Sequence, residues 1–465
     1  MADRHDDVDA WLSERIEPLP PPPGTFDLIK RRARRRKYRK LAITAGSAAV
    51  IVAAAVTVPQ VVNLPVLNPN PTAAPVAGAQ HSTATPSAGR SASGNASSAA
   101  SSAVPFTAPV PGNFRPTSVT FVSTHTGWVI GQALTPGDCA TQFCTSVART
   151  GDAGKTWTGV PAPMAGPPDG ATGLSQIRFL NLKDGWAYGP QLYATRTGGR
   201  TWAPVDTGGL RVTALETVGD RVFAVWASCT GDGPAYAAGC TRFTLYSAPA
   251  TGGVWTPVGA PTTGLTNGAA REATELVLTG SRGYLLAPSG ALYSGPVDGS
   301  GPWTRVSSLA ASCPVGPARA DGQPTGALLG AVNASDLILA CVSASSGTSP
   351  SVSTQQKFIY SSNNGGVSWQ QKATAPAAGV AFGLAASPAN SVVLATDRGI
   401  DLLPRGEIRW RTASLRGGAP ADGFRYIGMT TDDQGIALPA DPSAGTVWFT
   451  FDGGQSWTPS RLNGS

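Results

Sequence analysis

The fold of this chain is decided by an eight-residue phrase that first reads Thr150-Gly-Asp-Ala-Gly-Lys-Thr-Trp157. The clearest later copies are Ser362-Asn-Asn-Gly-Gly-Val-Ser-Trp369 and Thr450-Phe-Asp-Gly-Gly-Gln-Ser-Trp457. A tryptophan closes the phrase seven times, and successive tryptophans are 45, 53, 48, 66, 41 and 47 residues apart. One aromatic signature in every 40 to 50 residues or so is typical of the blades of a β-propeller.

The sequence around each copy has the pattern of four short strands. In the first unit, large apolar residues alternate with small or polar ones over Ser118–Val122, Gly127–Gly131, Ser146–Thr150 and Thr156–Val160. The second unit repeats this pattern over residues 176–205. Because such alternation marks strands and four strands form one blade, we predict an all-β, seven-bladed β-propeller over residues 113–465.

Each part of the phrase has a physical role. The Asp or Asn side chain can bond backbone N–H groups and close a tight turn between the third and fourth strands. The glycine accepts the positive φ that this turn needs, and we expect the tryptophan to point inward and fill the wedge beside the neighbouring blade. Structural roles are therefore predicted for Asp152, Gly154, Trp157, Gly199, Trp202, Trp255, Trp303, Asn364, Gly366, Trp369, Trp410, Asp452, Gly454 and Trp457.

Some copies of the phrase are worn. The third, fourth and sixth copies, at residues 251–255, 298–303 and 405–410, keep the tryptophan but lose most of the turn residues. The second copy has Thr197 in the position of the aspartate. Worn copies that retain their tryptophan indicate that the core anchor matters more than the turn chemistry.

The net charge of +7 belongs mainly to the N-terminal tail, where nine Lys and Arg residues lie within Lys30–Lys40. No charged residue follows from Leu41 until Arg90. At 1.5 Å per residue, residues 41–62 are about long enough to cross a hydrocarbon core of roughly 30 Å, so we predict a transmembrane helix there. The cations then place residues 1–40 in the cytoplasm. A cleaved signal peptide, or a twin-arginine export signal at Arg35-Arg36, is the alternative.

Residues 63–112 are mostly Pro, Ala, Ser and Thr with almost no charge. Such a segment buries too little apolar surface to offset its ordering entropy, and we expect a disordered stalk. The rest of the chain is nearly neutral, which gives no sign of a nucleic-acid-binding surface. The prediction is a single-pass cell-membrane protein whose propeller, residues 113–465, is extracellular.

Six cysteines lie beyond the predicted anchor. An even number outside the membrane indicates three disulfides, and nearest-neighbour pairing is the simplest of 15 connectivities. It would join Cys139 to Cys144, Cys229 to Cys240 and Cys313 to Cys341. Zinc binding is the alternative, but the chain has no CxxC pair and its three histidines are scattered, so we predict neither a metal site nor another cofactor.

The phrase is similar to the Asp box, also called the bacterial neuraminidase repeat. Its recurrence over residues 113–465 resembles the propellers of sialidases and of photosystem II assembly factor-like proteins, and, with the predicted anchor, the membrane-anchored actinobacterial type. The resemblance implies that the Asp box lies at the blade periphery and is structural. We therefore assign no catalytic residue to it.

A sialidase-like glycoside hydrolase is the alternative function. The resemblance would then imply an arginine triad, a Tyr/Glu nucleophile pair and an Asp acid/base, with a Phe-Arg-Ile-Pro-like phrase near the start. The nearest match, Phe114-Arg-Pro116, lacks the apolar residue. Glycoside hydrolysis generally uses two positioned carboxyl groups, and no convincing pair is evident among the four glutamates beyond the anchor, Glu216, Glu272, Glu275 and Glu407.

The loops give the remaining functional signal. In a blade with strands a to d, the a–b and c–d turns share one face, and the b–c loops lie on the other. Residues 139–144, 229–240 and 343–356 all fall at b–c positions. Because recognition usually resides in loops on a rigid scaffold, we predict a non-catalytic binding or assembly module for a protein or cell-envelope glycan at this face. Disulfides that merely pin long loops, or a structural role within a membrane complex, are the alternatives; no binding residue is assigned.

Overall fold

The computed structural model describes residues 108–134, 144–166, 173–230, 240–261, 275–287, 290–309, 313, 326–343 and 353–462. The cytoplasmic tail predicted at residues 1–40, the transmembrane helix at 41–62 and nearly all of the stalk lie outside this part. Within the described ranges, no helix has the length and apolar character needed to span a bilayer.

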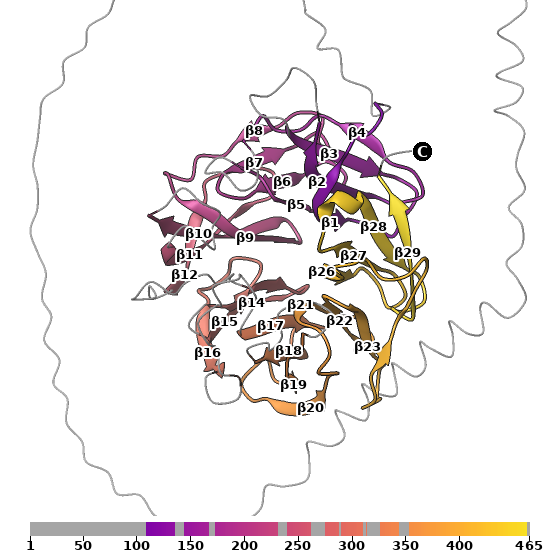
Figure 1. The fold of residues 1–465 in the computed structure, drawn as a ribbon. Helices are drawn as coiled ribbons and strands as arrows, with labels where there is room; N and C mark the ends of the chain where they lie inside the picture. Colours follow the sequence, from indigo (N-terminus) through magenta and orange to yellow (C-terminus); the bar gives the residue numbers. More distant parts are fainter. Residues whose placement is uncertain are drawn as a thin grey trace, which may run out of the picture. The chain divides into compact units, whose positions relative to one another are not determined.

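The seven predicted blades are confirmed as seven antiparallel sheets arranged around a common centre (Figure 1). Blades 1 and 2 contain β1 (Arg115–Phe121), β2 (Gly127–Ala133), β3 (Cys144–Thr150), β4 (Thr158–Val160), β5 (Gln176–Phe179), β6 (Gly185–Tyr188), β7 (Leu192–Thr195) and β8 (Ala203–Pro204). Blades 3 and 4 contain β9 (Arg211–Val218), β10 (Arg221–Cys229), β11 (Cys240–Pro249), β12 (Thr256–Pro261), β13 (Glu275–Leu278), β14 (Arg282–Leu286), β15 (Ala291–Pro296) and β16 (Thr304–Ser308).

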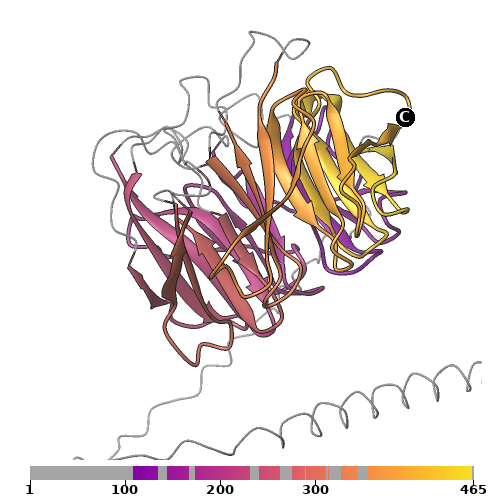
Figure 2. The same ribbon diagram turned by 90° about the horizontal axis from the view of Figure 1, so that it is seen from below.

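The second half of the ring follows the same plan. Blades 5 and 6 contain β17 (Gly326–Ala331), β18 (Leu337–Val342), β19 (Lys357–Ser362), β20 (Gln370–Thr374), β21 (Ala381–Ala386), β22 (Val392–Thr396), β23 (Gly399–Leu403) and β24 (Arg411–Thr412). Blade 7 contains β26 (Phe424–Met429), β27 (Gly435–Pro439), β28 (Thr446–Thr450), β29 (Ser456–Arg461) and the edge strand β25 (Ser414–Leu415), and the 3-10 helix η2 (Pro442–Ala444) lies between β27 and β28. Figure 2 shows the strands running from one face of the ring to the other.

Each four-stranded blade is built from consecutive strands, so the ring closes without a strand exchanged between the chain ends. Two short pairings reinforce the edges instead. β25, which follows blade 6, pairs in parallel with β29 of blade 7. Ala108 pairs with Gly159 of β4, so the end of the predicted stalk is already part of blade 1.

The core consists of seven apolar clusters, and each lies between two neighbouring blades. Between blades 1 and 2, the rings of Trp128 and Phe179 stack with their centroids 3.8 Å apart. Burying side chains of this size removes about 150–250 Å² each from water. Stability therefore comes mainly from blade-to-blade packing.

The closing tryptophans occupy the outer end of these clusters. Each packs against the preceding blade, as the sequence predicts, but only Trp303 and Trp457 are fully buried. The other five are half-buried, because the fourth strand forms the rim of the ring and one side of its residues meets solvent. Those five are Trp157, Trp202, Trp255, Trp369 and Trp410.

Blades 7 and 1 meet around Phe449, which is buried. Its ring lies edge-on to Phe121 with the centroids 5.7 Å apart. Gly154 has a φ of 80° and lies so close to Phe449 that a Cβ atom there would overlap the ring. The indole N–H of Trp157 donates to Ser460 Oγ at 3.1 Å across the same seam.

We predict that Gly154→Ala destabilises the propeller by about 2–4 kcal/mol, through overpacking against Phe449 and the left-handed backbone. Gly208→Ala is the matched control, since Gly208 has a φ of 62° but open space around it. It should cost only about 1 kcal/mol. If denaturant titrations show the same loss of stability for both variants, the packing of Gly154 against Phe449 does not limit the stability of the propeller.

Candidate functional site

The c–d turns satisfy their own polar groups. Asp152 accepts hydrogen bonds from the backbone N–H of Thr156 at 2.9 Å and from its hydroxyl at 2.6 Å. The Thr150 hydroxyl donates to Asp152 at 2.8 Å and accepts from the Gly154 N–H at 3.0 Å. Although burial would raise it, the hydrogen bonds from Thr156 and Thr150 hold the pKa of Asp152 below its ordinary value. The hydrogen bonds of the Asp152 carboxylate therefore lie within the turn itself.

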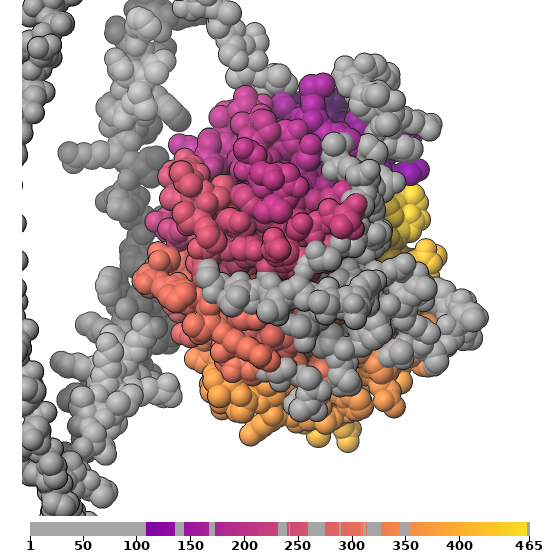
Figure 3. All heavy atoms as spheres, turned by 90° about the vertical axis from the view of Figure 1, so that its left-hand side faces the viewer, coloured from indigo at the N-terminus to yellow at the C-terminus, as the bar shows by residue number. Residues whose placement is uncertain are grey.

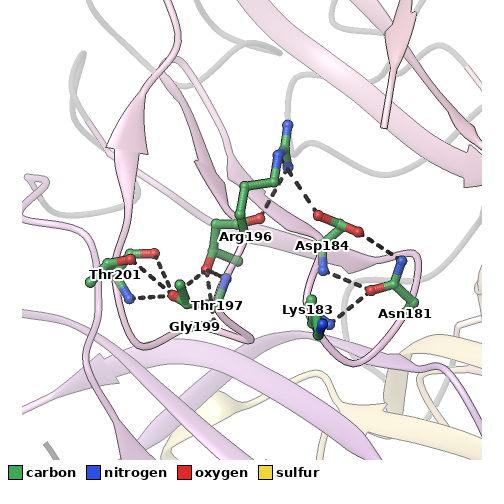
Figure 4. A network of polar contacts seen from close by, with 8 residues as sticks. Asn181, Lys183, Asp184, Arg196, Thr197, Gly199 and Thr201 are labelled. Carbon is green, nitrogen blue, oxygen red and sulfur yellow. Dashed lines mark hydrogen bonds and ion pairs between the residues drawn. The ribbon is translucent and has the colours of Figure 1, made fainter. Parts of the chain in front are cut away.

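The second copy reaches the same geometry without a carboxylate (Figure 4). Thr197 Oγ1 accepts the Thr201 N–H at 2.9 Å, and Thr195 Oγ1 accepts the Gly199 N–H at 3.0 Å. A threonine hydroxyl therefore replaces the aspartate, as the alignment of the copies indicates.

The a–b and c–d turns share one face, which we call the turn face. In blade 2 the N–H of Gly198 donates to the carbonyl oxygen of Lys183 at 2.9 Å, and Arg196 lies 3.7 Å from the Asp184 carboxylate. Figure 4 shows these turns side by side. Their polar groups are largely paired with each other, so the turn face has few groups left to hold a ligand.

The opposite face, which we call the loop face, carries the b–c loops and the d–a connections. The disulfides Cys229–Cys240 and Cys313–Cys341 are confirmed, and both lie at this end of the strands. Cys144 is disulfide-bonded as well, while Cys139 lies outside the described residues. Most of the long b–c loops also lie outside the described part.

A buried lysine braces the base of the blade 5 loop. Lys357 is completely buried, and its Nζ donates to the carbonyl oxygens of Gly379 at 2.7 Å and Ala378 at 3.1 Å, with longer bonds to Gln355 and Ala377. Burial lowers its pKa to about 8, so at neutral pH the ammonium group remains mostly protonated. One cation thus joins the end of the loop to the connection between blades 5 and 6.

A polar cluster lies on the innermost strands around the ring axis. Arg178 in β5 donates through Nε to Glu216 in β9 at 2.7 Å and through Nη1 to Ser118 in β1 at 3.2 Å. Burial alone would lower the pKa of Arg178, but the Glu216 carboxylate raises it above its ordinary value. The ion pair joins blades 2 and 3, and the hydrogen bond to Ser118 adds blade 1.

Glu275 in β13 belongs to the same electrostatic environment. Burial raises its pKa to about 7, and the charge of Glu216 adds to the shift. The structure thus brings two carboxyl groups into interaction, a pair that the sequence analysis did not find. Glu407 lies apart, paired with Arg411 at 2.7 Å, and Glu272 is outside the described residues.

Several of these residues were missed in the sequence. Arg178 occupies a strand position flanked by Ile177 and Phe179, and a charge on an innermost strand was the available signal. Lys357 lies immediately after the long blade 5 loop and gave no local signal, because its closest partners are the carbonyl oxygens of Ala378 and Gly379, 21 and 22 residues away. No group of three or more His, Cys, Asp or Glu side chains in the described ranges could hold a metal ion.

Comparison with known proteins gives structural similarity only. No family model matches the sequence, and no curated protein does. A solved structure of YCF48 bound to a D1 peptide is 17% identical, with a TM-score of 0.40, over 62% of this chain and 80% of that one. YCF48 from Cyanidioschyzon merolae is 14% identical, with a TM-score of 0.41, over 62% and 85% of the two chains. An ancestral GH74 enzyme is 14% identical, with a TM-score of 0.48, over 77% of this chain and 47% of that chain. We draw no functional conclusion from similarities this low.

The raised pKa of Glu275 makes stability depend on pH. Between about pH 4.5, its ordinary value, and pH 7, the folded protein holds a proton that the unfolded chain releases. The contribution is complete below pH 4.5 and is lost as the pH rises through 7. We expect wild type to lose about 1–2 kcal/mol more than Glu275→Gln over this range, since the amide imitates the protonated acid. If the free energy of unfolding, measured by denaturant titration, depends on pH in the same way for wild type and Glu275→Gln, then Glu275 is not the group responsible.

Proposed function

We propose that this protein is a membrane-anchored extracytoplasmic propeller that binds a protein or cell-envelope glycan, without catalysis, on its loop face. In this proposal residues 1–40 lie in the cytoplasm, residues 41–62 span the membrane and residues 63–112 form the stalk. The two observed disulfides support an oxidising compartment, since such bonds persist outside the cytoplasm. No cofactor or nucleic acid enters this function.

The observation that carries the proposal is the difference between the two faces. On the turn face, the side chains of the phrase mainly bond each other and the adjoining turn. On the loop face, the ends of the loops are fixed by disulfides and by the Lys357 ammonium group. Fixing the ends of a loop lowers the entropy that the loop loses on binding.

A photoreactive side chain placed on each face tests the proposal in cells that carry the full chain. Gln356 on the loop face and Val367 on the turn face are both exposed residues of blade 5, which makes them a matched pair. We expect crosslinked products from position 356 and none from position 367, with mass spectrometry identifying protein or sugar. Products from position 367 alone would overturn the assignment of the binding face.

A glycoside hydrolase is the second candidate, favoured by one observation. Glu275, with a raised pKa, interacts electrostatically with Glu216, which is paired with Arg178, so two carboxyl groups share one environment. Against it, the Glu216 carboxylate is already engaged with a guanidinium group at 2.7 Å.

We expect no turnover of a panel of fluorogenic glycosides by the full chain. The matched variants are Glu275→Gln and Glu407→Gln, the latter changing a surface ion pair remote from the axis. Turnover that survives Glu407→Gln and falls by at least a hundredfold in Glu275→Gln would establish the hydrolase instead.

A further inference from the structure

Four polar side chains on the innermost strands form what we call the axial cluster. Arg178, Glu216, Glu275 and Tyr426 come from β5, β9, β13 and β26. In Figure 3 blades 2, 3 and 4, magenta to salmon, follow one another along the visible side of the ring. The axial cluster therefore combines the inner edges of three successive blades with that of blade 7.

The charges of the axial cluster are only partly compensated. Arg178 Nε donates to Glu216 Oε1 at 2.7 Å, so one guanidinium group balances one carboxylate. Glu275 interacts electrostatically with that same carboxylate, and neither an ion pair nor a hydrogen bond compensates it within the described ranges. With both glutamates ionised, one positive and two negative charges leave the axial cluster with a net charge of −1. The cluster thus lacks one cation.

Three oxygen-bearing groups of the axial cluster have no hydrogen-bond partner within the described part of the chain. They are the Glu275 carboxyl group, the Oε2 atom of Glu216 and the Tyr426 hydroxyl. None of these atoms is fully buried, and the side chains of Arg178 and Glu216 are 16% and 29% exposed. Polar groups that reach solvent but lack a protein partner are available to a ligand.

The sequence leaves room beside the Tyr426 hydroxyl. Two residues further along β26, a Cβ atom at Gly428 would lie 2.9 Å from this oxygen, which is closer than a side-chain carbon normally approaches. Burial raises the pKa of Tyr426, so the hydroxyl is uncharged at neutral pH. An uncharged phenol oxygen can accept a hydrogen bond from a cation while its own proton is donated elsewhere.

The innermost strands of blades 5 and 6 carry no polar side chain. β17 reads Gly-Ala-Leu-Leu-Gly-Ala, and β21 reads Ala-Phe-Gly-Leu-Ala-Ala. Phe382 and Leu384 of β21 are half-buried, so part of each side chain remains accessible. The axis is thus bordered by carboxyl groups in blades 3 and 4 and by hydrocarbon in blades 5 and 6.

The chemistry that complements this arrangement is a primary ammonium group on an aliphatic stem. An ammonium group has three N–H donors and no acceptor, which matches three groups that can accept. Its charge would pair with ionised Glu275, and its stem would cover apolar surface. A calcium ion fits less well, because it takes about six to eight oxygen ligands and one oxygen of Glu216 is already held by Arg178.

We propose that the axial cluster binds the ammonium group of a primary alkylamine, with Glu275, Glu216 and Tyr426 as acceptors. A lysine side chain of a partner protein and a free polyamine both present this group, and the experiment separates the two sources. The inference is independent of the proposed function, since its ligand requires neither the b–c loops nor the loop face.

The test is a calorimetric titration of the full chain with Nα-acetyl-lysine methylamide. The matched ligand is Nα-acetyl-norleucine methylamide, which has the aliphatic stem without the ammonium group. We expect only the lysine derivative to bind. Glu275→Gln keeps the shape and removes the charge, and should weaken binding about tenfold or more. Glu407→Gln changes a surface ion pair and should leave the affinity unchanged.

Proton release is the readout that a merely structural role of Glu275 would not produce. Burial and the neighbouring Glu216 charge raise the pKa of Glu275 to about 7, so below this pH a bound cation must displace the proton. The affinity should therefore rise by up to about tenfold for each pH unit, and level off above about pH 7. Arg178 stays charged and Tyr426 uncharged over this range. In Glu275→Gln the pH dependence should disappear.

A second variant guards against a general effect of charge. Tyr426→Phe removes one acceptor and keeps the ring, so it should weaken binding about three- to tenfold and leave the pH dependence intact. The proposal is overturned if the lysine derivative does not bind, if the norleucine derivative binds equally, if Ca²⁺ binds in its place, or if Glu275→Gln binds like wild type. Cadaverine distinguishes the sources: weaker binding than the lysine derivative supports a partner protein's lysine, and tighter binding supports a free polyamine.

Discussion

The glycine at the fifth position of the phrase lies against a side chain of the preceding blade: Phe449 for Gly154, Leu292 for Gly366 and Val393 for Gly454. This approach is possible only because the glycine lacks a Cβ atom and adopts a positive φ. The polar residues of the phrase hold the turn in that conformation. The packing of blades 1, 5 and 7 on the blades that precede them depends on this contact.

The same contact explains where the ring differs from a uniform repeat. At the junction of blades 1 and 2, Trp202 and the Pro161 carbonyl complete the seam. At the next junction the phrase is worn, and aromatic rings line a groove together with the connection that follows β8. The axis differs as well, since Arg178, Glu216 and Glu275 concentrate charge on the innermost strands of three successive blades. The features that distinguish one blade from another therefore occur where one repeat departs in sequence from the rest.

The predictable part of the structure is the part with local causes. Blade number follows from the tryptophan period, and the role of Thr197 follows from the alignment of the copies. Two cysteine pairs follow from nearest-neighbour spacing. The degree of burial of each tryptophan could not be predicted, because the period reports that a residue faces a neighbouring blade and not how far out along that blade it lies. Glu216 and Glu275 were not paired in advance, since they are 59 residues apart in the sequence.

The sequence by itself determined the four-stranded unit, its sevenfold repetition and the turn that closes each unit, because these depend on alternation, glycine φ and side chain-to-backbone hydrogen bonds within a few residues. Only the tertiary structure decided which polar groups meet on the axis, which carbonyl oxygens surround Lys357 and which blade junction stays open. Those properties depend on contacts between separate blades, and the distance between two inner strands is fixed by the whole ring.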